Sequence, residues 1–72
     1  MLRPDNSPPP NRGYQIRDLR HCAEREVGWR RMVYRNRVAT HRMSQAQANS
    51  EIDKMAAIAE LLGELEKKDR LL

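Results

Sequence analysis

The chain has 72 residues, of which 39% are hydrophobic and 33% charged, with one cysteine and no phenylalanine. A chain of this length forms one domain at most, which excludes a multidomain enzyme. A single core below about 70–80 residues rarely contributes more than about 3–5 kcal/mol to the free energy of unfolding. The lone cysteine excludes an intramolecular disulfide, and no apolar run approaches the roughly 18 residues of a membrane span. We therefore expect a small cytoplasmic protein, without a cofactor, that gains stability by self-association.

Positive charge is concentrated in the first part of the chain. Residues 1–42 hold ten arginines against four acids, a net charge of +6, whereas residues 43–72 carry a net charge of −2. Arginine pairs bidentately with carboxylates and with phosphates. The sequence therefore predicts either an anionic partner or pairing with the acidic half of the same chain.

The four prolines all lie within residues 1–13. Consecutive prolines favour polyproline II and exclude a helix, and little apolar surface is present there to bury. We therefore expect a disordered, proline-rich arm over residues 1–13 and a single structural unit over residues 14–72.

A helical repeat follows over residues 15–40. Gly28 interrupts it at a cost of about 1 kcal/mol relative to alanine, so that either the helix tolerates this glycine or another segment approaches closely there. The apolar residues recur at steps of three and four and share one side of the helix: Ile16, Leu19, Ala23, Val27, Tyr34 and Val38.

A second helix is predicted over residues 44–70. Ser44 and Gln47 have the spacing of a capping box, in which each side chain accepts a hydrogen bond from the other residue's amide. Its apolar stripe consists of Ala48, Ile52, Met55, Ala59 and Leu62, flanked by Leu65.

Only residues 41–43 remain for the turn between the two helices. A turn that short requires the helices to run antiparallel. Pairing across it places Val38 against Ala48 and Ala23 against Leu62, so apolar positions meet along the whole length. The sequence therefore predicts an all-α fold, an antiparallel two-helix hairpin.

A second apolar group remains uncovered, because two facing helices bury one stripe each. We interpret it as an oligomer interface, most simply that of a dimeric four-helix bundle, although a higher oligomer or another partner would serve equally. The alternative is a tryptophan that lies flat on the hairpin surface. The predicted interface residues are Cys22, Trp29, Val33, Ile58, Leu61 and Leu65.

A basic stripe is predicted along one side of the first helix. Phosphate backbones bind such stripes without reading bases. The alternative is a solvated or protein-facing side, balanced by the acids of a neighbouring helix. Its members flank the apolar stripe and are Arg17, Arg20, Arg31, Arg35 and Arg42.

Arg30 falls on the central apolar stripe, where an unpaired charge is costly. Three arrangements are open. Its head reaches solvent while its stem packs, or it pairs with a carboxylate, Glu51 being favoured over Glu26. In the third, Arg30 lines a seam between subunits and meets a ligand, with Tyr34 and Arg37 beside it.

Metal-binding or catalytic chemistry finds little support in the sequence. His21 and Cys22 are adjacent and therefore point about 100° apart on a helix, and His41 is distant. This spacing does not match a tetrahedral zinc site, and two helices offer no deep cleft for a cysteine nucleophile. We therefore expect no metal and no enzymatic activity.

One set of motifs spans about residues 20–62: an Arg-rich stretch running into Val33-Tyr34, a short turn with Arg42-Met43, and a second helix with Glu51-Ile52 and Met55. In these motifs the chain resembles a group of small proteins encoded by phages and prophages. It departs from that group at Arg35, Arg37 and His41, where the group often has proline, tryptophan and the turn glycine. The resemblance implies a viral or prophage origin and action by binding, including inhibition of host or defence proteins.

Together these features predict a non-enzymatic protein-interaction module, in the form of a phage-encoded inhibitor or accessory factor of a host or defence protein. The alternative is a small nonspecific nucleic-acid-binding protein that uses the basic stripe. A third option is an oligomer whose arginines capture a phosphorylated small molecule at the subunit seams.

Overall fold

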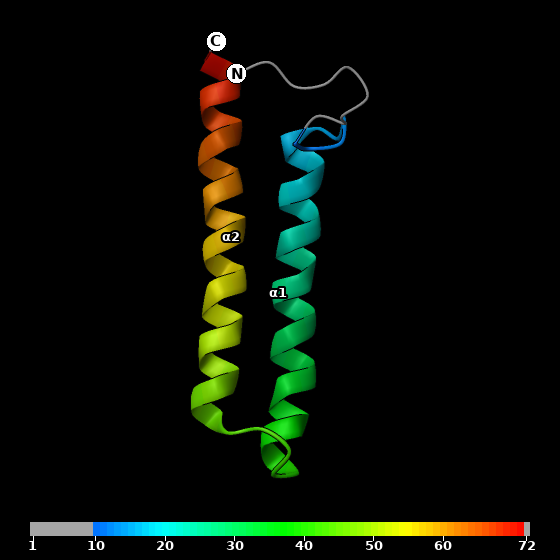
Figure 1. The fold of residues 1–72 in the computed structure, drawn as a ribbon, viewed down its shortest axis with the longest axis vertical. Coiled ribbons are helices and arrows are strands. Elements are labelled where there is room, and N and C mark those ends of the chain that lie inside the picture. Colours follow the sequence, from blue (N-terminus) through cyan, green and yellow to red (C-terminus); the bar gives the residue numbers. More distant parts are fainter. Residues whose placement is uncertain (1–9, 72) are drawn as a thin grey trace.

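Residues 10–71, which the computed structural model describes, form two α-helices joined by a short turn. Helix α1 spans Ile16–Ala39 and helix α2 spans Gln45–Leu71. The helices lie side by side and antiparallel, so the start of α1 and the end of α2 are at the same end of the molecule (Figure 1). The predicted all-α hairpin is confirmed.

The turn that precedes α1 begins at the end of the proline-rich segment. Residues 10–13 form this turn, in which the Tyr14 amide donates to the Asn11 carbonyl oxygen at 3.0 Å. The Asn11 side-chain amide donates in return to the Tyr14 carbonyl oxygen. The disordered arm predicted over residues 1–13 falls for the most part on residues 1–9, which lie outside the described residues.

Helix α1 ends in a Schellman motif. The His41 amide donates to the Val38 carbonyl oxygen at 3.1 Å, and the Arg42 amide donates to the Arg37 carbonyl oxygen at 2.8 Å. This pattern requires a left-handed backbone at His41, whose φ is 60°. Glycine usually takes that position, because a Cβ there clashes with the following carbonyl.

Helix α2 begins with the predicted capping box. The Gln47 amide donates to Ser44 Oγ at 3.0 Å, and the Ser44 amide donates to Gln47 Oε1 at 3.1 Å. Two amides that the first helical turn leaves without a partner are thereby satisfied. The capping box is confirmed, and it ends the turn one residue before Gln45.

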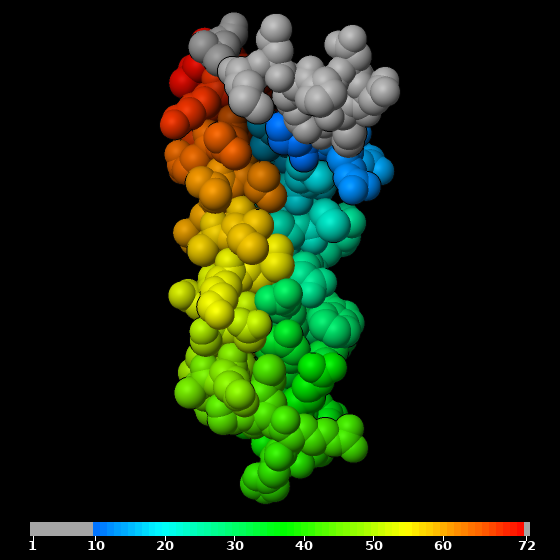
Figure 2. Space-filling view, in the orientation of Figure 1, coloured from blue at the N-terminus to red at the C-terminus, as the bar shows by residue number. Residues whose placement is uncertain are grey.

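The core between the helices is thin. Its members come from the predicted stripes, and side chains fill the space between the two ribbons along their length (Figure 2). Among the described residues, no large side chain is fully buried. The buried hydrophobic residues are Ala23, Val27, Tyr34, Ala48 and Ala59.

Close to the turn, the helices pack in the predicted register. Tyr34 and Val38 of α1 line one hollow together with Ala48 and Ile52 of α2. At the other end of the hairpin, Arg20 Cδ lies 3.6 Å from the position of a Cβ built on Gly63. Among the described residues, the same built Cβ at Gly28 would meet nothing within 4 Å, so the helix tolerates this glycine without a close approach that requires it.

The molecule is a rod. Its Cα radius of gyration is 16.2 Å, whereas a compact domain of this length has a radius of about 11 Å. A rod of two helices has much surface for its volume, so large apolar side chains remain exposed.

Candidate interaction surfaces

An apolar face runs along one side of the hairpin. Trp29 of α1 is 48% exposed and Leu61 of α2 is 63% exposed. At 100° per residue, its members on each helix all lie on the same side of the buried stripe. Because α1 and α2 run antiparallel, these two sides are on the same face of the hairpin. The apolar face comprises Cys22, Trp29, Val33, Ile58, Leu61 and Leu65, all exposed except the half-buried Val33.

Met32 is an exposed apolar side chain that the sequence analysis did not single out. It is 65% exposed. Helical geometry places it about 180° from the buried stripe, on the side of α1 that faces away from α2. It lies about 60° around the helix from Trp29 and therefore borders the apolar face without facing α2.

The basic stripe is interrupted at Arg20, which forms ion pairs within the hairpin. Arg20 Nε donates to Glu66 Oε1 at 2.5 Å, and Arg20 Nη1 donates to both carboxylate oxygens of Glu24 at 3.1 Å. These hydrogen bonds raise the pKa of Arg20, and the one from Arg20 lowers the pKa of the Glu66 carboxyl. Arg20 therefore fastens α1 to α2 instead of belonging to a free cationic surface.

Glu66 is a residue that the sequence analysis missed. Its side chain is 13% exposed and accepts from both Arg20 and Arg70. Position 66 continues the apolar stripe of α2 at a step of four from Leu62 and seven from Ala59. That spacing was the available signal: a carboxylate on the buried stripe requires a cationic partner from the other helix.

Arg30 pairs with Glu26, and the preference for the carboxylate of Glu51 is wrong. Arg30 Nε donates to Glu26 Oε1 at 3.0 Å, and Arg30 Nη1 donates to the backbone carbonyl oxygen of Glu51 at 2.9 Å. The Glu51 carboxylate is held by Lys54 at 3.1 Å. Arg30 therefore crosslinks the helices through a main-chain acceptor, and the Glu26 hydrogen bond raises its pKa.

Arg37 lies beside Tyr34. The Arg37 guanidinium carbon is 5.5 Å from the centroid of the Tyr34 ring, within the range of a cation–π contact. The ring itself belongs to the buried core. Tyr34 therefore positions a cation at the surface close to the turn.

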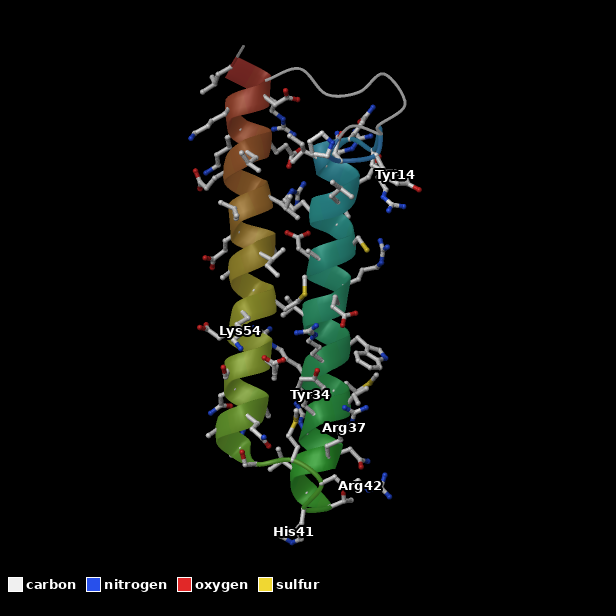
Figure 3. The ribbon with its side chains drawn as sticks, viewed as in Figure 1. Tyr14, Tyr34, Arg37, His41, Arg42 and Lys54 are labelled. Carbon is white, nitrogen blue, oxygen red and sulfur yellow. The ribbon has the colours of Figure 1, made fainter. Side chains whose placement is uncertain are left out.

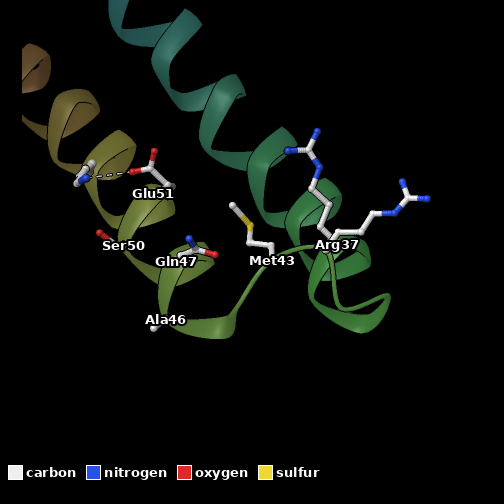
Figure 4. A pocket seen from close by; sticks show the side chains of 8 residues that line it. Arg37, Met43, Ala46, Gln47, Ser50 and Glu51 are labelled. Carbon is white, nitrogen blue, oxygen red and sulfur yellow. Dashed lines mark hydrogen bonds and ion pairs between the residues drawn. The ribbon is translucent and has the colours of Figure 1, made fainter.

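A cationic tip surrounds the turn end of the hairpin. Arg37 and Arg42 line a hollow of about 650 Å³ with Gln47, Ser50 and the Lys54–Glu51 pair (Figure 4). Both arginines lie at the turn, at the opposite end from Tyr14 (Figure 3). A second hollow, of about 410 Å³, contains Arg31 and Arg35. We define the cationic tip as Arg31, Arg35, Arg37 and Arg42.

The arginines of the cationic tip differ from Arg20 and Arg30 in their partners. None of the four forms an ion pair with a carboxylate of the described residues, whereas Arg20 and Arg30 both do. Arg17 of the predicted stripe is far from the tip and lies 3.8 Å from Asp18, with both side chains exposed. The structure thus divides the stripe into a paired end and an unpaired end.

Metal-ligating clusters and membrane-spanning helices are two features that the described residues lack. No group of three or more His, Cys, Asp or Glu side chains in this part of the chain is placed to hold a metal ion. Neither α1 nor α2 has the length and apolarity needed to cross a membrane. Cys22 is a free, exposed thiol.

Compared with known proteins, the chain matches no family model, no curated protein and no solved structure. Its fold and surfaces define an antiparallel helical hairpin with one uncovered apolar face and one cationic end.

Proposed function

We propose that this chain is a non-enzymatic protein-interaction module whose apolar face pairs with the same face of a second copy. The observation that carries the proposal is the combination of a thin, alanine-rich core with large exposed side chains on one face, Trp29 and Leu61 among them. Fully burying such a side chain contributes about 1.5–3 kcal/mol relative to leaving it exposed. Association thus supplies stability that two helices alone lack.

The resemblance to small phage-encoded and prophage-encoded proteins supports a further part of this proposal. In this part of the proposal, the paired hairpins act in the cytoplasm of a host cell by binding a host or defence protein. The hollows on the hairpin are open grooves on the surface of two helices (Figure 4). Such surfaces suit binding better than chemistry that must exclude water.

Light scattering coupled to gel filtration tests the self-association. We expect the full chain to elute as a dimer or a larger oligomer, and Trp29→Glu or Leu61→Glu to dissociate it and reduce its helicity. Tyr14→Glu is the matched control, since it adds the same charge at an exposed apolar side chain that precedes α1 and lies outside the apolar face. We expect Tyr14→Glu to keep the oligomer.

Trp29 provides a second readout, because it is the single tryptophan of the chain. Its fluorescence emission should move to shorter wavelength as protein concentration rises, since association removes the ring from water. A chain that stays a stable helical monomer, with unchanged emission at all concentrations, contradicts the proposal. Equal dissociation by Tyr14→Glu would also contradict it, because a charge outside the apolar face would then disrupt the oligomer as effectively as one within it.

A further inference from the structure

We infer that the cationic tip is a binding site for the phosphodiester backbone of nucleic acid, independent of base sequence and separate from the apolar face. Four arginines, Arg31, Arg35, Arg37 and Arg42, lie within the last turns of α1 or in the turn itself. By the 1.5 Å rise of a helix, Arg31 is only about 13 Å along the axis from Thr40. This places four cations at one end of the molecule.

The first argument is the lack of internal partners at the tip. Arg20 and Arg30 are held by carboxylates of the hairpin, but the four tip arginines have no carboxylate within ion-pair distance among the described residues. Glu51, the acid in the Arg37 hollow, is held by Lys54 at 3.1 Å. The positive charge of the tip therefore remains available to an external anion.

Asp53 lies beside the other side of the tip. It lines a shallow hollow with Arg31, but the two side chains form no ion pair in the described structure. Asp53 therefore weakens the field at the Arg31 edge and leaves Arg35, Arg37 and Arg42 as the centre of the site. A ligand that follows the tip meets more positive than negative charge on both faces.

The second argument is the choice of side chains and their surroundings. A guanidinium forks around two phosphate oxygens, and it binds phosphate with more directional contacts than an ammonium does. The hollows also hold neutral hydrogen-bond donors, Gln47 and Ser50 on one side and Gln45 on the other. The tip combines charge with neutral donors, as phosphate-binding surfaces do.

The third argument is the shape of the site. The two hollows lie on opposite sides of the turn end, one with Arg37 and Arg42 and the other with Arg31 and Arg35. The arginines therefore do not converge on one small anion. A polymer with a phosphate at every step contacts several of them at once, whereas a single phosphorylated small molecule reaches only one hollow.

Fluorescence anisotropy with short labelled oligonucleotides tests the site. Four phosphate contacts predict a slope of log affinity against log salt of about −3.6 for duplex DNA and about −2.8 for a single strand. Raising the salt from about 50 to about 200 mM then weakens duplex binding about 150-fold. Separate titrations with duplex DNA, single-stranded DNA and single-stranded RNA identify which nucleic acid the tip prefers.

The variant that tests the assignment combines Arg35→Gln with Arg42→Gln, one from each hollow. It should reduce the duplex slope to about −1.8, so that the same rise in salt weakens binding only about 12-fold. The matched control combines Arg17→Gln with Arg25→Gln, which removes the same charge from α1. Arg25 is about 15 Å along the axis from Arg35, beyond the roughly 10 Å Debye length at 0.1 M salt.

The control double variant should keep the slope of the unmodified chain. Light scattering and circular dichroism establish that both double variants keep the fold and the oligomeric state. Equal loss of slope in the two double variants, or no binding to any of the oligonucleotides at low salt, overturns the inference. Polyglutamate that binds as tightly as the oligonucleotides would also overturn it, because the tip would then recognise an acidic protein surface.

Discussion

Replacing His41 with glycine should stabilise the hairpin. His41 has φ 60° at the position of the Schellman motif where glycine is usual. A left-handed backbone costs an L-residue roughly 1–2 kcal/mol, whereas glycine loses about 0.5–1 kcal/mol more backbone entropy on folding. The net expectation for His41→Gly is a gain of about 0.5–1 kcal/mol, which raises the Tm by about 2–8 °C.

Thermal unfolding followed by circular dichroism measures this gain. All variants are compared at one protein concentration, since association makes the Tm concentration-dependent. His41→Ala is the matched control, because it removes the imidazole but keeps the Cβ that causes the strain. His41→Asn should fall between alanine and glycine, since asparagine tolerates a left-handed backbone better than most residues.

Two results would refute the reasoning about the turn. If His41→Ala raises the Tm as much as His41→Gly, the imidazole and not the Cβ is unfavourable in the native turn. If His41→Gly lowers the Tm, the left-handed backbone at this position stores no strain. In both cases the positive φ would have no energetic consequence.

Two further predictions concern the helices. Gly28→Ala should stabilise the chain by about 1 kcal/mol, because an added Cβ there meets nothing within 4 Å; a lower urea midpoint would reveal an unrecognised close approach at Gly28. The hydrogen bond from Arg20 lowers the pKa of the Glu66 carboxyl below the ordinary value of 4.5. The stabilisation of the fold by this ion pair is therefore present above pH 4.5 and is lost as the pH falls through the folded-state pKa of Glu66. The urea midpoint of the unmodified chain should accordingly fall in acid. Glu66→Gln should be less stable at neutral pH, and its urea midpoint should depend less on pH. Parallel pH profiles of the two proteins would exclude this linkage.

The elements of the fold follow from local patterns in the sequence. A stripe repeated at steps of three and four predicts each helix, and the Ser44–Gln47 capping box marks where α2 begins. A turn of a few residues then requires an antiparallel hairpin, because the chain has no length to connect the helices otherwise. These features were predictable because each depends on residues that are neighbours in sequence.

The two apolar groups also follow from the sequence, because the positions around a helix are set by its period. The buried stripe and the apolar face were distinguished by angle alone, and Trp29 and Leu61 are exposed where the angles place them. Met32 was missed because a lone apolar residue on the outer side of a helix breaks no pattern. Its exposure is apparent only once α2 covers the opposite side of α1.

The partners that Arg20 and Arg30 find on the other helix were decided by the tertiary structure alone. Arg30 bonds to Glu26 and to the backbone carbonyl of Glu51, although the sequence analysis favoured the Glu51 carboxylate. A long side chain can reach several acceptors whose positions differ by a few ångströms. Helix periodicity does not define the axial offset of two helices to that precision. For the same reason only the packed hairpin separates Arg20, which pairs with Glu66 and Glu24, from the arginines of the cationic tip, which form no ion pair among the described residues.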